Sequence, residues 1–185
     1  MNKKRITLLV LCAIFAIAIL GGCGAQQPAP QQETPKTNEP EKPNTDAVTT
    51  ASIVNNGEAF LKAASKDGTW IIATLNDLTI DKEIVLEGEF KNKDVVARKI
   101  ALYTQDDDHK VTARFSLKAP KLTVKSENAR IQSGTFVGDV YVEAKGFSLV
   151  DAKVEGNVYF ASEEVKSTFK MDDKSSVTGK QEVKQ

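Results

Sequence analysis

The stretch Ala129-Arg130-Ile131-Gln132 recurs as Ala152-Lys153-Val154-Glu155 and as Ser175-Ser176-Val177-Thr178, each time 23 residues further along the chain. Each copy alternates polar and apolar residues, which is the pattern of a half-buried β-strand. A second short strand pattern precedes each copy, at Leu122-Thr123-Val124, Phe147-Ser148-Leu149 and Phe169-Lys170-Met171. A fixed period with short strands in each unit is typical of a β-solenoid, in which every coil stacks on the one before it.

The period also predicts which side chains stack on one another. We expect Ile131, Val154 and Val177 to form one interior column, with Arg130, Lys153 and Ser176 outside. The fold prediction is an all-β chain, a right-handed parallel β-solenoid of about five coils with a short N-terminal capping helix. The alternative is a β-sandwich, which has a similar density of strands but no need for residues that recur at fixed spacing.

One helix is expected, over residues 56–66. Ala59, Phe60, Ala63 and Ala64 share a helical face, with Asn55 or Asn56 as the N-cap and Gly68 after the end. From Thr69 onward, runs rich in Val, Ile, Thr and aromatic residues predict short strands. Five of these runs lie at residues 70–75, 78–80, 84–86, 99–103 and 111–117.

Two parts of the chain resemble known β-helix families. Residues 56–90 resemble the opening segment of pectin-lyase-like right-handed β-helices, where a short amphipathic helix caps the first coil. Ala152-Lys153-Val154-Glu155-Gly156-Asn157-Val158 is similar to the repeat units of bactofilins, which are polymer-forming bacterial β-helix proteins. The resemblance implies a fold, and a fold alone does not specify a function.

The N-terminus has the features of an export signal. Lys3, Lys4 and Arg5 precede an apolar run over residues 6–20, which is shorter than the roughly 20 residues that span a bilayer. Leu20-Gly21-Gly22-Cys23 then resembles the lipobox of bacterial lipoproteins, which implies that Cys23 is lipidated and becomes the mature N-terminus. The alternative is an ordinary secretory signal that is cut nearby.

This interpretation divides the chain into three parts. Residues 1–22 are the signal peptide, residues 23–52 are the lipidated cysteine and a disordered Pro/Gln-rich tether, and residues 53–185 are the solenoid domain. Five of the six prolines fall within residues 24–50, which have no aromatic residue to support a core. The expected location is extracytoplasmic, with the protein held at the bacterial cell membrane through Cys23.

Composition argues against several functional classes. Residues 1–22 hold three of the 25 basic residues and none of the 25 acidic ones, so the mature chain has a net charge of about −3 and no basic excess for nucleic acid. Cys12 leaves with the signal. Asp106-Asp107-Asp108-His109 lacks the alternating spacing of a calcium loop, and we expect it to form a solvated turn. We therefore expect no cofactor, no metal and no catalytic residue.

One candidate ligand strip remains, at Tyr141, Tyr159, Asp139 and Asn157. Gly138-Asp139-Val140-Tyr141-Val142 is echoed by Gly156-Asn157-Val158-Tyr159-Phe160, which would place tyrosine over tyrosine and aspartate under asparagine on the outer surface. Exposed tyrosine rings can stack on sugars. The alternative is that the two tyrosines only support each other as a ladder.

Three functions are consistent with these observations. The first is a cell-surface lipoprotein with a non-enzymatic solenoid as a scaffold or interaction domain, whose partners are the membrane and an envelope polysaccharide or protein. The second is a lipoprotein that binds carbohydrate or a cell-wall polymer. The third, a polysaccharide-cleaving β-helix enzyme, would need acidic pairs on one outer face, and the step from Asp139 to Asn157 breaks such a pair.

Overall fold

The computed structural model describes residues 51–184. Cys23, the signal segment and residues 1–50 of the expected tether lie outside the described residues. Within the described part, strands dominate and the all-β class is confirmed. The first strand, β1 (Ala51–Val54), starts two residues before the expected domain boundary, because residues 51 and 52 already pair with a neighbouring strand.

A six-stranded sheet is built entirely from parallel neighbours. Each strand pairs with one that comes much later or earlier in the chain, so consecutive members are joined by long connections. In spatial order the strands are β1, β2 (Ile71–Thr74), β7 (Arg98–Ala101), β11 (Ala129–Gln132), β13 (Ser148–Val150) and β16 (Lys170–Met171).

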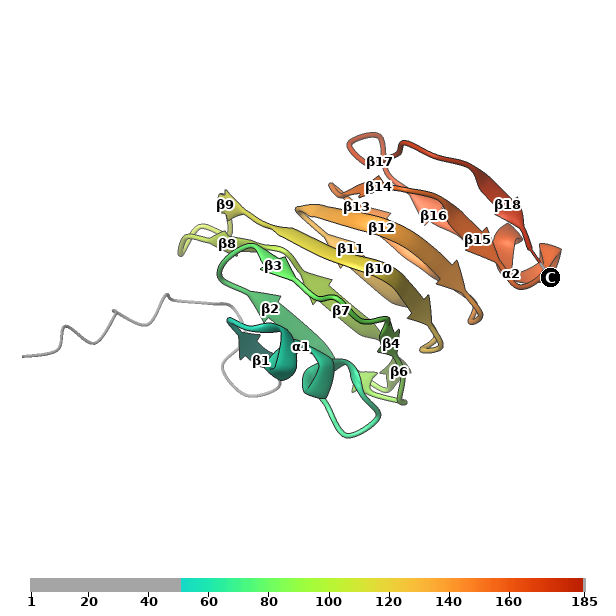
Figure 1. Cartoon of the computed structure of the whole chain (residues 1–185). Helices are drawn as coiled ribbons and strands as arrows, with labels where there is room; N and C mark the ends of the chain where they lie inside the picture. The colour runs from blue at the N-terminus through green and yellow to red at the C-terminus, as the bar shows by residue number, and fades with distance from the viewer. Residues whose placement is uncertain (1–50, 185) are drawn as a thin grey trace, which may run out of the picture. The chain divides into compact units, whose positions relative to one another are not determined.

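The connections contribute a second, eight-stranded sheet, which is also parallel. Its two long strands lie at the centre and pair with each other, and each also pairs with two shorter strands that follow one another in the chain (Figure 1). The members are β3 (Leu78–Thr79), β4 (Ile84–Leu86), β10 (Ser116–Val124), β12 (Thr135–Val142), β14 (Lys153–Glu155), β15 (Val158–Phe160), β17 (Ser176–Val177) and β18 (Gln181–Val183).

Two antiparallel hairpins interrupt this alternation between the sheets. One pairs β5 (Lys91–Asn92) with β6 (Val95–Val96) and turns at Lys93 and Asp94, which both have positive φ as tight hairpin turns require. The other pairs β8 (Tyr103–Gln105) with β9 (Val111–Arg114). Both hairpins are therefore additions to the repeating path of the chain.

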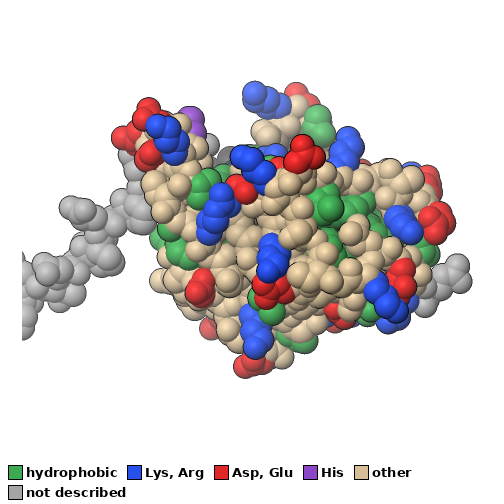
Figure 2. All heavy atoms as spheres, turned by 90° about the horizontal axis from the view of Figure 1, so that it is seen from above, with side chains coloured by type: hydrophobic (Ala, Val, Ile, Leu, Met, Phe, Trp, Pro, Cys, Tyr) green, Lys and Arg blue, Asp and Glu red, His purple; other side chains and the backbone are tan. Residues whose placement is uncertain are grey.

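The inward side chains of the two sheets form one hydrophobic cluster. Ile131 on β11 lies in register between Ile100 and Leu149, and Val154 on β14 lies in register between Phe136 and Val177. All but the last of these are buried, with Val177 partly buried at the edge. The cluster contains none of the charged side chains, so the polar residues that alternate with it face outward (Figure 2).

The predicted column of Ile131, Val154 and Val177 is wrong at its first step. Ile131 belongs to the six-stranded sheet, whereas Val154 and Val177 belong to the eight-stranded sheet. Arg130 is likewise separated from Lys153 and Ser176, which do pair with each other. Leu149 stacks on Ile131 and Val154 stacks on Phe136 after only 18 residues.

The 23-residue step holds only where the chain contains an extra helix. Val177 follows Val154 after 23 residues, and the connection between β15 and β16 includes α2 (Glu163–Ser167). Ser162 caps this helix through its side-chain oxygen, which accepts a hydrogen bond from Val165 N. The predicted period therefore combines a basic 18-residue unit with one local insertion.

The predicted N-terminal helix is confirmed as α1 (Gly57–Ala64). Asn56 caps it, since its Oδ1 accepts a hydrogen bond from Ala59 N at 2.9 Å. The helix ends before the expected Lys66, at a Ser65 whose backbone is extended. Phe60, Ala63 and Ala64 are buried in the main cluster, so α1 covers part of the core close to β1 and β4 (Figure 1).

Close stacking of the backbone requires glycine at one corner of the repeating unit. Gly156 has φ +158°, and a Cβ there would lie 2.0 Å from the carbonyl oxygen of Gly138. The same relationship holds one unit earlier, where a Cβ on Gly138 would lie 1.9 Å from the carbonyl oxygen of Ala119. Any larger residue would push neighbouring strands apart at this corner.

Candidate functional site

The structure brings Tyr141 and Tyr159 together, as the sequence predicts. They occupy matching positions on β12 and β15, their ring centroids lie 4.9 Å apart, and the ring planes meet at 44°. Both side chains are half-buried. Lys184 lies beside them, with Nζ 4.4 Å from the centroid of the Tyr159 ring, and Lys121 Nζ lies 5.1 Å from that of Tyr141. The pair is therefore part of a cation–π cluster.

Asp139 and Asn157 also lie together, but their polar atoms bind the protein itself. Asp139 Oδ1 accepts hydrogen bonds from both the backbone N and the Nδ2 of Asn157, each at 2.9 Å. Asn157 Oδ1 in turn accepts from Lys180 N at 2.9 Å. These bonds tie three successive passes of the chain to one another. Their geometry matches the ladder alternative, and the ligand strip stays a prediction.

The acidic run forms the turn of the β8–β9 hairpin, as expected from its position between two strands. Asp106 Oδ1 accepts a hydrogen bond from Lys110 N at 2.8 Å, and His109 has φ +61°. The ring of His109 is held through Nδ1, 2.8 Å from Gln105 Nε2. Within residues 51–184, no three His, Cys, Asp or Glu side chains are grouped as metal ligands would be.

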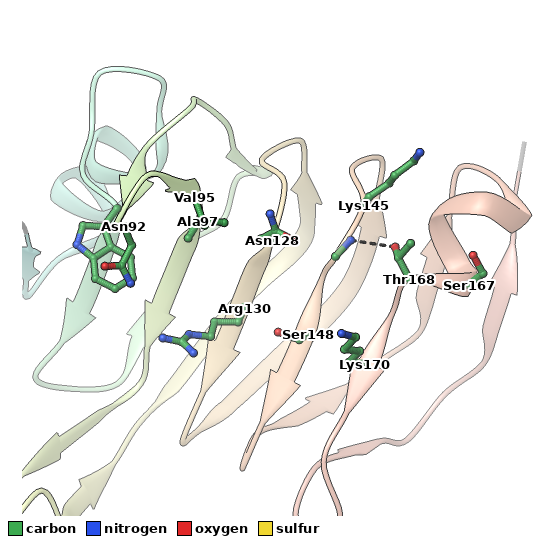
Figure 3. A pocket seen from close by; sticks show the side chains of 12 residues that line it. Asn92, Val95, Ala97, Asn128, Arg130, Lys145, Ser148, Ser167, Thr168 and Lys170 are labelled. Carbon is green, nitrogen blue, oxygen red and sulfur yellow. Dashed lines mark hydrogen bonds between the residues drawn. The ribbon is translucent and has the colours of Figure 1, made fainter.

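The most prominent hollow lies elsewhere, on the outer face of the six-stranded sheet. It is a groove of about 680 Å³ that runs from the β5–β6 hairpin across the strands to α2 (Figure 3). Its lining is polar and basic with a few apolar groups. The residues are Trp70, Asn92, Val95, Ala97, Asn128, Arg130, Lys145, Gly146, Ser148, Ser167, Thr168 and Lys170.

A row of residues in register crosses the floor of this groove. Arg130 on β11, Ser148 on β13 and Lys170 on β16 pair across three adjacent strands, and Figure 3 shows them side by side. Lys99 on β7 continues the row beyond Arg130, where its Nζ donates to the Tyr103 hydroxyl at 2.9 Å. Three of the four residues in the row are cationic.

Neutralisation of the groove is incomplete. Lys145 Nζ lies 2.5 Å from Glu164 Oε1, and that hydrogen bond raises the pKa of Lys145 and lowers the pKa of Glu164. Within residues 51–184, neither Arg130 nor Lys170 takes part in an ion pair. No acidic residue lines the groove, so its floor presents positive charge.

One corner of the sheet shapes the upper edge of the groove. Asn128 has φ +51°, and its Nδ2 donates to Val96 O at 2.9 Å, which holds the β5–β6 hairpin against the sheet. A Cβ on Gly146 would lie 2.3 Å from Asn128 Oδ1, so glycine is required there. Gly146 N donates to Thr168 Oγ1 at 2.9 Å, shown as the dashed line in Figure 3.

The sequence reasoning missed this groove because it assigned Arg130 to the wrong column. A 23-residue period aligns Arg130 with Lys153, whereas the observed 18-residue step aligns it with Ser148. The echo between Gly138-Asp139 and Gly156-Asn157 carries the 18-residue spacing. Had that spacing been applied to Arg130, it would have predicted this neighbour.

Comparisons with known proteins place no name on this arrangement. Searches of protein families, curated proteins and solved structures found no match to the chain. Among residues 51–184, no helix has the length and apolar character needed to cross a membrane. Function is therefore argued from the groove, the tyrosine cluster and the N-terminal sequence.

Proposed function

We propose that this chain is a bacterial cell-surface lipoprotein whose folded part is a non-enzymatic scaffold or interaction domain. The observation that carries the proposal is the use of surface polar groups to join successive passes of the chain. Asp139 and Asn157 form one such ladder, and Asp172 forms another. Groups held in this way favour a rigid surface for presentation over a reaction centre.

The second ladder has the same design. Both carboxylate oxygens of Asp172 accept from Asp151 N at 3.0 Å, and the carboxylate of Asp151 lies 2.7 Å from Arg114 Nη2. Ser175 Oγ donates to Asp172 Oδ1 at 2.5 Å. Four residues from separate turns are thereby tied into one chain of contacts.

We further propose that the domain is a right-handed parallel β-solenoid capped by α1. Two observations support this proposal. The chain passes alternately between the two sheets and returns each time to a parallel partner, whereas β-sandwiches are built from antiparallel strands. The core lies between the two sheets along their whole stack, as it would in coils that enclose it.

The anchoring part of the proposal rests on Leu20-Gly21-Gly22-Cys23 and the apolar run before it. In cells fed a labelled fatty acid, the full chain should be labelled and should sediment with membranes. Cys23→Ser should abolish the label, because a serine hydroxyl cannot form the thioether to a diacylglyceryl group. Label that persists in the variant overturns this assignment.

The non-enzymatic part is tested by incubating the purified full chain with envelope polysaccharides. We expect the average chain length of each polymer to stay unchanged, as measured by size-exclusion chromatography. Depolymerisation with turnover would establish the cleaving enzyme instead. In that case Asp139 and Arg130 would be the first residues to substitute.

A further inference from the structure

We propose that the groove on the outer face of the six-stranded sheet binds an anionic polysaccharide of the cell envelope. The choice of a polysaccharide over other polyanions rests on the proposed extracytoplasmic location. The groove itself is described by residues that the sequence analysis did not assign to any site.

Charge is the first argument. Arg130 and Lys170 lie on the floor without an ion-pair partner within residues 51–184, and the lining contains no carboxylate. The mature chain as a whole is slightly acidic, so this positive floor is a local feature and does not reflect general basicity. A ligand with acidic groups complements it.

Spacing is the second argument. Arg130 and Lys170 lie two strands apart in register, with Ser148 between them. Neighbouring strands are about 4.8 Å apart, so the two cationic positions are separated by roughly 10 Å along the floor. A glycan that carries an acidic group on every second sugar presents its charges at a comparable interval. The Ser148 hydroxyl can donate to or accept from the sugar between them.

The rest of the lining suits sugar rings. Asn92, Ser167 and Lys145 line the sides of the groove with groups that can form hydrogen bonds, and Val95 and Trp70 add apolar surface at the hairpin end. Sugars combine hydroxyl edges with apolar faces, and both kinds of surface are present here. The groove crosses the strands, so a linear polymer would lie perpendicular to them (Figure 3).

The test measures binding of the purified full chain in detergent to four polymers at low ionic strength. Polygalacturonate supplies carboxylates, poly(glycerol phosphate) supplies phosphates, dextran is neutral, and single-stranded DNA is a polyanion without the glycan character. We expect polygalacturonate, poly(glycerol phosphate) or both to bind, and binding to weaken as salt is added. The stronger of the two identifies the acidic group.

The decisive variant is the double substitution Arg130→Gln with Lys170→Gln. It should weaken binding about tenfold, which corresponds to two partly screened charge contacts. The matched control is Lys118→Gln with Lys174→Gln, which removes the same charge from exposed positions outside the groove. The control should bind within about twofold of the parent. Thermal melting of both double variants checks that each remains folded.

Three results overturn the proposal. They are equal loss of binding in the groove and control variants, equal or tighter binding to single-stranded DNA or dextran, and no binding to either acidic polymer. The outcome is separate from that of the lipidation test. A chain that binds polygalacturonate through Arg130 but takes no fatty-acid label at Cys23 would retain the groove and lose the surface-lipoprotein assignment.

Discussion

Arg98 Nη2 donates a hydrogen bond to the carbonyl oxygen of Ala63 at 2.5 Å, across 35 residues of sequence. The guanidinium also bonds to the carbonyl oxygens of Ser65 and Glu87, and it lies 4.0 Å over the ring of Phe90. Two of these acceptors lie at the C-terminal end of α1, where helical carbonyls lack partners and carry partial negative charge. Arg98 therefore fastens α1 to β7.

Arg98→Met should destabilise the full chain by about 3 kcal/mol, because it removes the donor from several buried carbonyl groups at once. Burial lowers the pKa of Arg98 to about 10, so the side chain is still charged at pH 7. The change is measured by urea denaturation at pH 7. Arg114→Met is the control. Its exposed ion pair with Asp151 should be worth about 1 kcal/mol or less, and equal losses would contradict the role given to Arg98.

Gly156→Ala should cost about 2 kcal/mol or more, since the new methyl group meets the Gly138 carbonyl and φ is strained. Gly57→Ala is a useful comparison, because its Cβ would only approach the flexible Ile80 side chain at 3.1 Å in the first turn of α1. There the change should stay within about 1 kcal/mol. Melting temperatures that fall equally in the two variants would argue against backbone contact at Gly156.

Val154→Asp should unfold the domain, because it places an unpaired charge at a position with no solvent exposure. Its neighbour Lys153 points outward and pairs with Glu155 at 2.7 Å. Lys153→Asp should cost about 1 kcal/mol or less. Far-UV circular dichroism of the two variants separates the inward from the outward position. A folded Val154→Asp chain with parent-like stability would contradict the stacking of this strand.

Asp172→Asn should reduce the loss of stability in acid. Hydrogen bonds from Ser175 and then from the backbone N–H of Asp151 lower the pKa of Asp172 below the ordinary 3.8 of an aspartate. A depressed carboxyl pKa stabilises the fold above the unfolded value and loses that contribution as pH falls through the folded value. The free energy of unfolding should therefore decline less between about pH 5 and pH 2 in the variant than in the parent. A steeper decline would contradict the prediction.

The sequence predicts strand positions well where alternation is clear. The strand at residues 84–86 and the cap at Asn56 are confirmed, because hydrophobic alternation and capping depend on neighbours in the chain. Stacking depends on the length of every connection, and a single helix changes the count. Inserting α2 turned an 18-residue step into the 23-residue step from Val154 to Val177. The longer spacing was then extended to Ile131, where it fails.

The candidate site follows the same division. Tyr141 and Tyr159 meet because their identical flanking residues share one register. The contact of Arg98 with Ala63 has no local signal, because a buried arginine is visible only once the helix and the strand are placed together. The groove depended on the β5–β6 hairpin as well as on register. A pattern of residues does not specify how such a hairpin lies against a sheet.

The glycine corner at Gly138 and Gly156 has an evolutionary consequence. Residues 138–155 begin and end at equivalent positions, so a tandem duplication of that segment would present matching hydrogen-bonding edges and matching side chains to both neighbours. The chain could thereby grow or shorten by whole 18-residue units without redesign of its core. Lineages that carry such a domain would then vary in length in discrete steps, with the corner glycine retained in every added unit.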